Sequence, residues 1–249
     1  MWAKSDKLVQ VHFDQAEYDL RCEWGLPGLL ELAPLSDAVV IVDILSFSTA
    51  VDIAVSNGAS VLPYRWRDDS AGAFAKEKQA QLAHGRRSKS GYSLSPASLR
   101  TIPAGTALVL PSPNGSALSF TANHARTFTA CLRNAPAVAK HLAKSAAGVA
   151  VIAAGEQWSD QTLRPCVEDW IGAGAVLSLL PGRRSPEAEL AVAAFQHFRA
   201  DLKGALAGCG SGKELIEKGF RSDTDLASEY AVSSAVPMLM GDRFIDCSS

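Results

Sequence analysis

Residues 38–49 read AVVIVDILSFST: five apolar residues run into Asp43 and a group of hydroxyl side chains. An apolar run of this length that stops at a polar break is typical of a strand buried on both faces. The residues after the break suit a helix, which we expect to end at Asn57 and Gly58. This stretch therefore predicts one strand, one turn and one helix of an α/β fold.

The same order of apolar strand, polar break and helix recurs further along the chain, starting at strands 107–110 and 149–154. We expect further strands at 61–64 and 127–130, and helices at about 135–143, 168–180, 186–205 and 211–218. Strands joined through helices indicate a layered α/β/α fold around a largely parallel or mixed sheet. Because such sheets bind ligands beyond the carboxyl ends of their strands, the polar breaks are the places to look for a site.

Composition indicates a globular protein. Of the 249 residues, 47% are hydrophobic and 20% are charged, so burial can offset the entropy lost on folding. We expect a single α/β domain over residues 1–249, with two lobes that meet near residue 146 as the alternative. The 24 basic and 26 acidic residues give a net charge of −2, which argues against a nonspecific nucleic-acid or membrane-surface binder.

The chain has features of a cytoplasmic protein. Its first residues lack the apolar core of a secretory signal, and its longest apolar stretch, 171–180, is too short to cross a bilayer. The five cysteines lie far apart, without the spacing of a disulfide framework or a zinc site, so we expect reduced thiols. We expect no membrane or nucleic-acid partner, and the formation of a homo-oligomer stays open.

Asp43 is the first candidate for chemistry. It ends the apolar run, and Ser46, Ser48 and Thr49 follow within six positions. A carboxylate at a strand end suits Mg²⁺, and hydroxyls at the start of a helix suit an anion. The alternative is that these side chains cap the helix, and spacing alone favours that interpretation.

The other two breaks also carry candidates. Asn114 and Gly115 lie in a tight break where main-chain amides can face an oxyanion, although a plain turn is the alternative.

Glu156 follows the third strand, and Glu168 and Asp169 open the next helix. Three acids near one sheet edge can share a divalent ion. The alternative is that acids in a first helical turn complement the helix dipole, and sequence alone favours this interpretation.

Residues 84–89, His-Gly-Arg-Arg-Ser-Lys, concentrate positive charge in a glycine-containing loop. Arg86 and Arg87 suit phosphate, sulfonate or carboxylate groups, because a guanidinium binds two oxygens at once. The alternative is a solvated run of charge. Since Tyr92 is the one aromatic residue that follows closely, stacking of nucleic-acid bases is poorly supported.

In their order along the chain, these motifs resemble those of the 2-phosphosulfolactate phosphatase family, the ComB-like proteins. That family carries an apolar strand ending in Asp-Val-Leu-Arg-Ala-Ser/Thr-Ser/Thr and a helix ending in Asn-Gly-Ala; here 43–49 read DILSFST and 57–59 read NGA. Looser matches follow in the family's order at Gly85-Arg86-Arg87, Asn114-Gly115-Ser116, Leu132-Arg133-Asn134, Glu168-Asp169, Ala173-Gly174 and Val236-Pro237. The similarity spans about residues 38–240.

The resemblance implies a Mg²⁺-dependent phosphatase, a phosphoric monoester hydrolase, that acts on 2-phospho-3-sulfolactate or another small phosphorylated hydroxy acid. It also implies that Asp43 holds the metal with Glu168 or Asp169, and that Asn114 joins them in catalysis. The candidate substrate contacts at the matching motifs are Ser48, Thr49, Arg86, Arg87, Gly115, Ser116 and Asn134. Ser46 and Glu156, which lie where the chain departs from the family, complete the set of candidates.

One departure from the family bears on the substrate. Ser46 stands where the family has an arginine, so a charge-assisted contact to an anion is missing at this position. The loop from Glu156 to Pro165 is also longer than the family's approach to its Glu-Asp helix. The reaction class therefore transfers more readily than the substrate, and the alternative function is a homologue that binds a phosphorylated ligand without turnover.

Overall fold

The computed structural model describes residues 13–65, 68–86, 91–122 and 126–248. Their strands are β1 (Leu20–Trp24), β2 (Ala38–Val42), β3 (Ser60–Tyr64), β4 (Gln81–Leu82), β5 (Ala107–Pro111), β6 (Arg126–Thr129), β7 (Val149–Ala153), β8 (Glu156–Gln157), β9 (Leu163–Arg164), β10 (Pro237–Met240) and β11 (Arg243–Asp246). Their helices are α1 (Gly25–Leu32), α2 (Phe47–Ser56), α3 (Asp69–Glu77), α4 (Gly115–Thr121), α5 (Ala135–Ser145), α6 (Val167–Leu177), α7 (Pro186–Phe198), α8 (Leu202–Gly208), α9 (Gly210–Glu217) and α10 (Arg221–Ala227). None of these helices is long and apolar enough to cross a membrane.

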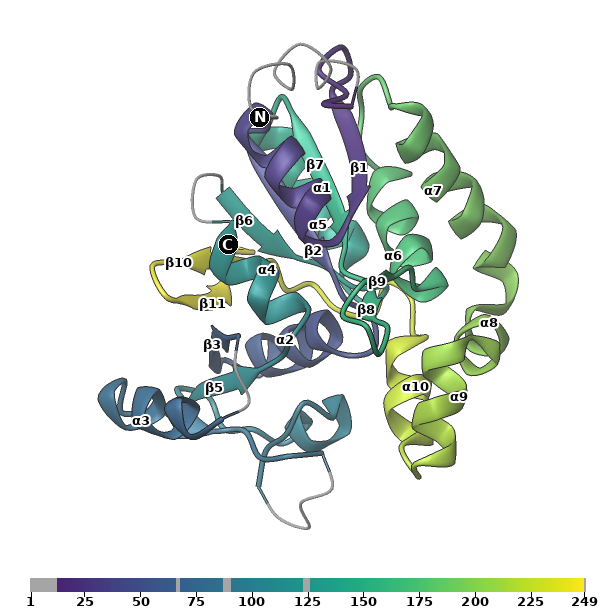
Figure 1. The fold of residues 1–249 in the computed structure, drawn as a ribbon. Helices are drawn as coiled ribbons and strands as arrows, with labels where there is room; N and C mark the ends of the chain where they lie inside the picture. Colours follow the sequence, from purple (N-terminus) through teal and green to yellow (C-terminus); the bar gives the residue numbers. More distant parts are fainter. Residues whose placement is uncertain (1–12, 66–67, 87–90, 123–125, 249) are drawn as a thin grey trace, which may run out of the picture.

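Nine of the described strands form one mixed sheet, in the order β1-β7-β2-β6-β10-β11-β3-β5-β4 (Figure 1). Strands β1, β7, β2 and β6 run parallel to one another, and so do β3, β5 and β4. The antiparallel hairpin β10–β11 lies between these two groups and pairs with β6 on one side and β3 on the other. This arrangement confirms the predicted layered α/β fold with a largely parallel or mixed sheet.

The central strand β2 is covered on both faces, which explains why its sequence is apolar without alternation. Val40 and Val42 belong to a buried cluster with residues of α5, α6 and α7. Val39 and Ile41 point the other way and pack with residues of α1 and α4. In the second group of strands, α2 and α3 cover opposite faces in the same manner. The sheet therefore holds its loops on a rigid, buried base.

Some boundaries differ from the prediction for local reasons. The helix expected over 186–205 is divided, because the side chain of Asp201 accepts a hydrogen bond from Gly204 N and starts α8 as a new helix. The helix expected at 211–218 begins at Gly210, where the Cys209 thiol accepts from the N–H of Gly212. The loop over 155–165 contains the short hairpin β8–β9.

Gly174 marks a close approach of α6 to α7 and yields a first prediction. A Cβ atom at Gly174 would lie 1.9 Å from the carbonyl oxygen of Ala191. Gly174→Ala should force these helices apart and lower the free energy of unfolding by about 2 kcal/mol. Gly72→Ala in α3 is the matched control, because its Cβ would meet nothing within 4 Å and alanine favours helix. Urea unfolding should show a lower free energy of unfolding for Gly174→Ala than for Gly72→Ala. Equal values for the two variants would contradict the close packing of α6 against α7.

Candidate active site

The loops that follow β2 and β5 are joined by the buried side chain of Asp43. Its Oδ1 accepts a hydrogen bond from Phe47 N at 3.1 Å, and its Oδ2 accepts one from Gly115 N at 2.9 Å. Glycine is required at 115, because a Cβ there would lie 2.8 Å from that same Oδ2 and 2.3 Å from the ring of Phe47. Asp43 thus bonds to the first turn of α2, as the capping interpretation expects, and also brings two strand ends together.

Asp169, in the first turn of α6, holds the same loop from another side. Its Oδ1 accepts from Ile44 N at 2.7 Å, and its Oδ2 accepts from Gly155 N at 2.9 Å. The second bond reaches the loop that follows β7. The carboxyl ends of β2, β5 and β7 are therefore tied together by two buried carboxylates and four main-chain N–H groups.

Several hydroxyl groups predicted to contact substrate serve the backbone instead. Ser48 Oγ accepts from Asp43 N at 2.8 Å, Thr49 Oγ1 donates to the carbonyl of Ile44 at 2.8 Å, and Ser116 Oγ donates to the carbonyl of Leu110 at 2.7 Å. All three side chains are buried. In this structure they shape the loops from within the protein.

Asn134 is also buried, at the start of α5. Its Oδ1 accepts from Cys131 N at 2.8 Å, while its Nδ2 lacks a hydrogen-bond partner among the described residues. Like the buried hydroxyls, the amide oxygen holds the turn that follows a strand, here β6.

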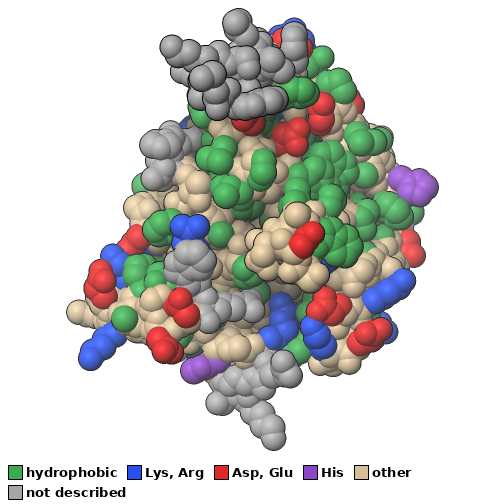
Figure 2. Space-filling view, in the orientation of Figure 1, with side chains coloured by type: hydrophobic (Ala, Val, Ile, Leu, Met, Phe, Trp, Pro, Cys, Tyr) green, Lys and Arg blue, Asp and Glu red, His purple; other side chains and the backbone are tan. Residues whose placement is uncertain are grey.

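Two cavities adjoin these loops, and Glu156 lines both of them. One, of about 600 Å³, is bounded by Leu45, Arg86, Glu156 and the residues of and after α9, including Ser211 and Lys218. The other, of about 640 Å³, is bounded by Arg65, Asn114, Glu156 and Gln157. Figure 2 shows basic and acidic side chains side by side over α9, where Lys218 pairs with Glu214. The predicted residues Arg86 and Glu156 thus share the first cavity.

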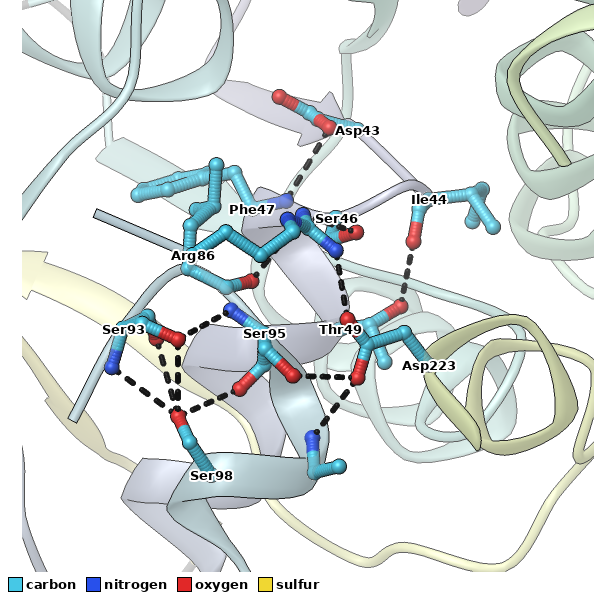
Figure 3. A network of polar contacts seen from close by, with 12 residues as sticks. Asp43, Ile44, Ser46, Phe47, Thr49, Arg86, Ser93, Ser95, Ser98 and Asp223 are labelled. Atoms are coloured by element: carbon cyan, nitrogen blue, oxygen red, sulfur yellow. Dashed lines mark hydrogen bonds and ion pairs between the residues drawn. The ribbon is translucent and has the colours of Figure 1, made fainter. Parts of the chain in front are cut away.

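Arg86 also meets Ser46, the position where this chain departs from the family motif (Figure 3). Its Nη2 donates to Ser46 Oγ at 3.0 Å, and its Nη1 donates to Asp223 Oδ2 at 2.5 Å. Its guanidinium carbon lies 5.3 Å from the centre of the Phe220 ring. A cation from the loop after β4 therefore reaches the loop after β2. The predicted Arg87 lies outside the described residues.

Negative charge accumulates on the other side of the site. Burial raises the pKa of Asp43 to about 7, and the charges of Glu156 and Glu168 add to this rise against the opposing bonds from Phe47 and Gly115. Burial likewise raises the pKa of Asp169 well above its usual range, with the charges of Asp43 and Glu168 as the next causes. A bound proton or a cation relieves such crowding.

These carboxylates suit Mg²⁺ in the nature of their donor atoms. Mg²⁺ prefers oxygen ligands and commonly takes one or two protein carboxylates, with water and substrate phosphate completing its shell. Within the described part of the chain, no three His, Cys, Asp or Glu side chains converge as ligands of one ion. Both oxygens of Asp43 and both oxygens of Asp169 already accept main-chain N–H bonds, so this geometry does not separate the two aspartates as partners of Glu168 at a metal with few protein ligands.

Sequence reasoning missed Asp223 and Phe220, both from the C-terminal part of the chain. Asp223 is 137 positions from its partner Arg86, and its own segment, RSDTDLASEY at 221–230, carries no pattern beyond that of a polar helix. A contact between residues so far apart is invisible to local spacing. The side chains that line the cavity from α9 were missed for the same reason.

Comparison with known proteins identifies the relatives of this chain. The family model for 2-phosphosulpholactate phosphatase matches residues 26–242. A protein of Pseudothermotoga lettingae named "Probable 2-phosphosulfolactate phosphatase" is 29% identical, over 83% of this chain and 91% of the relative. Proteins of the same name from Symbiobacterium thermophilum (25% identical, 86% and 95%) and Parasynechococcus marenigrum (29% identical, 75% and 82%) are also similar.

The raised pKa of Asp43 predicts a pH dependence of stability in metal-free buffer. The folded protein binds this proton more tightly than the unfolded chain, where aspartate titrates near about 3.9. The resulting stabilisation is complete below about pH 4 and is lost as the pH rises to about 7, with about 2 kcal/mol lost between about pH 5 and about pH 7. Asp43→Asn should remove this dependence of the free energy of unfolding on pH, which urea unfolding at several pH values measures. An unchanged dependence in the variant would mean that Asp43 titrates normally in the fold.

Proposed function

This chain belongs to the 2-phosphosulpholactate phosphatase family, and from that membership we propose that it hydrolyses the phosphate ester of a small, acidic hydroxy acid. The reference substrate is 2-phosphosulfolactate, which is what the names of the relatives describe. One observation in the structure of this protein supports the proposal. Arg86 and Glu156 line the same cavity at the carboxyl ends of the strands, beside the loop that Asp43 and Asp169 hold.

The cavity supports a substrate with more than one anionic group. Arg86 and Lys218 line it and can offer positive charge, while Glu156 and Glu214 supply negative charge nearby. We propose that Arg86 binds the acid or sulfonate end of the substrate, where a planar guanidinium can donate two hydrogen bonds. The phosphate would then lie toward Glu156 and the braced loop.

The proposed mechanism assigns a part to each acid. Mg²⁺, held by Asp43 together with Glu168 or Asp169, would supply positive charge that offsets the negative charge of the phosphate. Glu156 lines the cavity, and we propose that it accepts a proton from the water that attacks phosphorus. The ester P–O bond breaks as the oxygen of the hydroxy acid takes the proton that Glu156 accepted, which returns Glu156 to its carboxylate form. Asp169 keeps Ile44 and Gly155 in place and so orients the loops around the reacting groups.

Phosphate release with and without Mg²⁺ tests the reaction. The wild-type protein should release phosphate from 2-phosphosulfolactate or a related phosphorylated acid, and EDTA should abolish this. Asp43→Asn should lower kcat by about a hundredfold or more while circular dichroism stays unchanged. Asp37→Asn is the matched control, because Asp37 is exposed at the opposite end of β2.

Two results would contradict this assignment. A folded Asp43→Asn variant with wild-type turnover would remove Asp43 from the reaction. Binding of the phosphorylated acid by the wild-type protein without any release of phosphate would favour the alternative, a homologue that has lost turnover.

Replacing Arg86 tests the substrate clamp. Arg86→Ala should raise KM by about tenfold or more and change kcat less, because a group remote from the phosphorus is bound equally in the ground and transition states. Ser46→Ala removes one contact of Arg86 and should have a smaller effect in the same direction. Arg100→Ala, at an exposed arginine, is the control. Steady-state kinetics in which Arg86→Ala matches this control would show that Arg86 does not hold the substrate.

A further inference from the structure

Asp223 on α10 is a buried carboxylate with three donors. Its Oδ2 accepts from Arg86 Nη1 at 2.5 Å, and its Oδ1 accepts from Ser95 Oγ at 2.5 Å and from Ala97 N at 3.2 Å (Figure 3). The side chain is 0% exposed, so its charge depends entirely on these partners. Both oxygens are thereby fixed in position, one of them against the guanidinium that faces the cavity.

A network of serines holds the other side of Asp223. Ser95 N donates to Ser93 Oγ at 3.1 Å, and Ser98 Oγ donates to the carbonyl of Ser95 at 2.7 Å. Ser93 N donates in turn to Ser98 Oγ at 3.0 Å. Because these bonds close on one another, Ser95 has little freedom to move, and neither has the carboxylate that it contacts.

The guanidinium of Arg86 is therefore oriented from several directions. Asp223 accepts a hydrogen bond from its Nη1, Ser46 accepts one from its Nη2, and the ring of Phe220 lies beside it. An arginine side chain ordinarily loses rotamer freedom when a ligand fixes it. Here that cost is met before a ligand binds, which improves the affinity of a preorganised site.

We infer that Asp223 is a positioning residue for the substrate clamp: it acts through Arg86, and it holds the guanidinium ready for the anionic end of the substrate. This inference rests on the proposed function, since it needs Arg86 to contact the substrate. The competing explanation is that the ion pair between Arg86 and Asp223 simply ties α10 to the loop after β4.

A double-mutant cycle in ligand affinity separates the two explanations. The probe is 3-sulfolactate, the organic product expected from 2-phospho-3-sulfolactate, and calorimetry measures its Kd for the full chain. Asp223→Asn should raise Kd about tenfold and Arg86→Ala about tenfold to a hundredfold, while the double variant should match Arg86→Ala alone. Asp225→Asn is the matched control, because Asp225 lies on the same helix and pairs with Lys203 at the surface. Its Kd should stay at the wild-type value.

Ser95→Ala provides a milder second variant in case Asp223→Asn does not fold. It removes one of the donors to Asp223 and should raise Kd a few fold, again with no further effect in the Arg86→Ala background. A folded Asp223→Asn or Ser95→Ala variant with wild-type Kd would overturn the inference, and so would effects that add to that of Arg86→Ala. Failure of the wild-type protein to bind 3-sulfolactate would overturn the inference for this substrate, whereas only the absence of phosphate release from every phosphorylated acid tested would overturn the proposed function.

Discussion

The site depends on how two buried aspartates are satisfied. Removing a carboxylate from water is costly unless hydrogen bonds replace the solvent, and Asp43 and Asp169 each receive two main-chain N–H donors. Those donors come from three loops that follow different strands. The same bonds that offset the cost of burial therefore bring the loops together, and glycine at 115 leaves the space that the bond to Asp43 requires.

This bracing leaves an acidic side and a basic side. Main-chain N–H groups do not offset the burial of Asp43 and Asp169 and the repulsion from neighbouring carboxylates, so the pKa values of both aspartates stay raised. The basic side is supplied by Arg86, which is joined to the C-terminal helices through Asp223. A binding site built on loops needs those loops held in fixed positions. Here the buried sheet and the buried charged side chains hold them.

Much of the scaffold could be predicted from local sequence. The runs that became β2, β5 and β7 are apolar because helices cover both faces of the sheet, and this pattern is visible without a structure. Strand β1 was missed although its sequence, LRCEW, alternates apolar and polar residues as an edge strand does, because the prediction relied on continuous apolar runs. Family motifs pointed to Asp43 and Arg86, and position after a strand pointed to Glu156, but spacing could not tell that Ser48 and Thr49 are buried. The contact between Arg86 and Asp223 could not be predicted from local sequence, since Asp223 lies on a helix far along the chain.

The most direct test of this account is a crystal structure of the wild-type protein with Mg²⁺ and a non-hydrolysable phosphonate analogue of the substrate. The account predicts that the analogue occupies the cavity of about 600 Å³, with its carboxylate or sulfonate on Arg86 and its phosphonate toward Glu156. The ion pair between Arg86 and Asp223 should persist in that complex. An analogue bound away from Arg86, or a complex in which Arg86 has left Asp223 to reach it, would contradict the account.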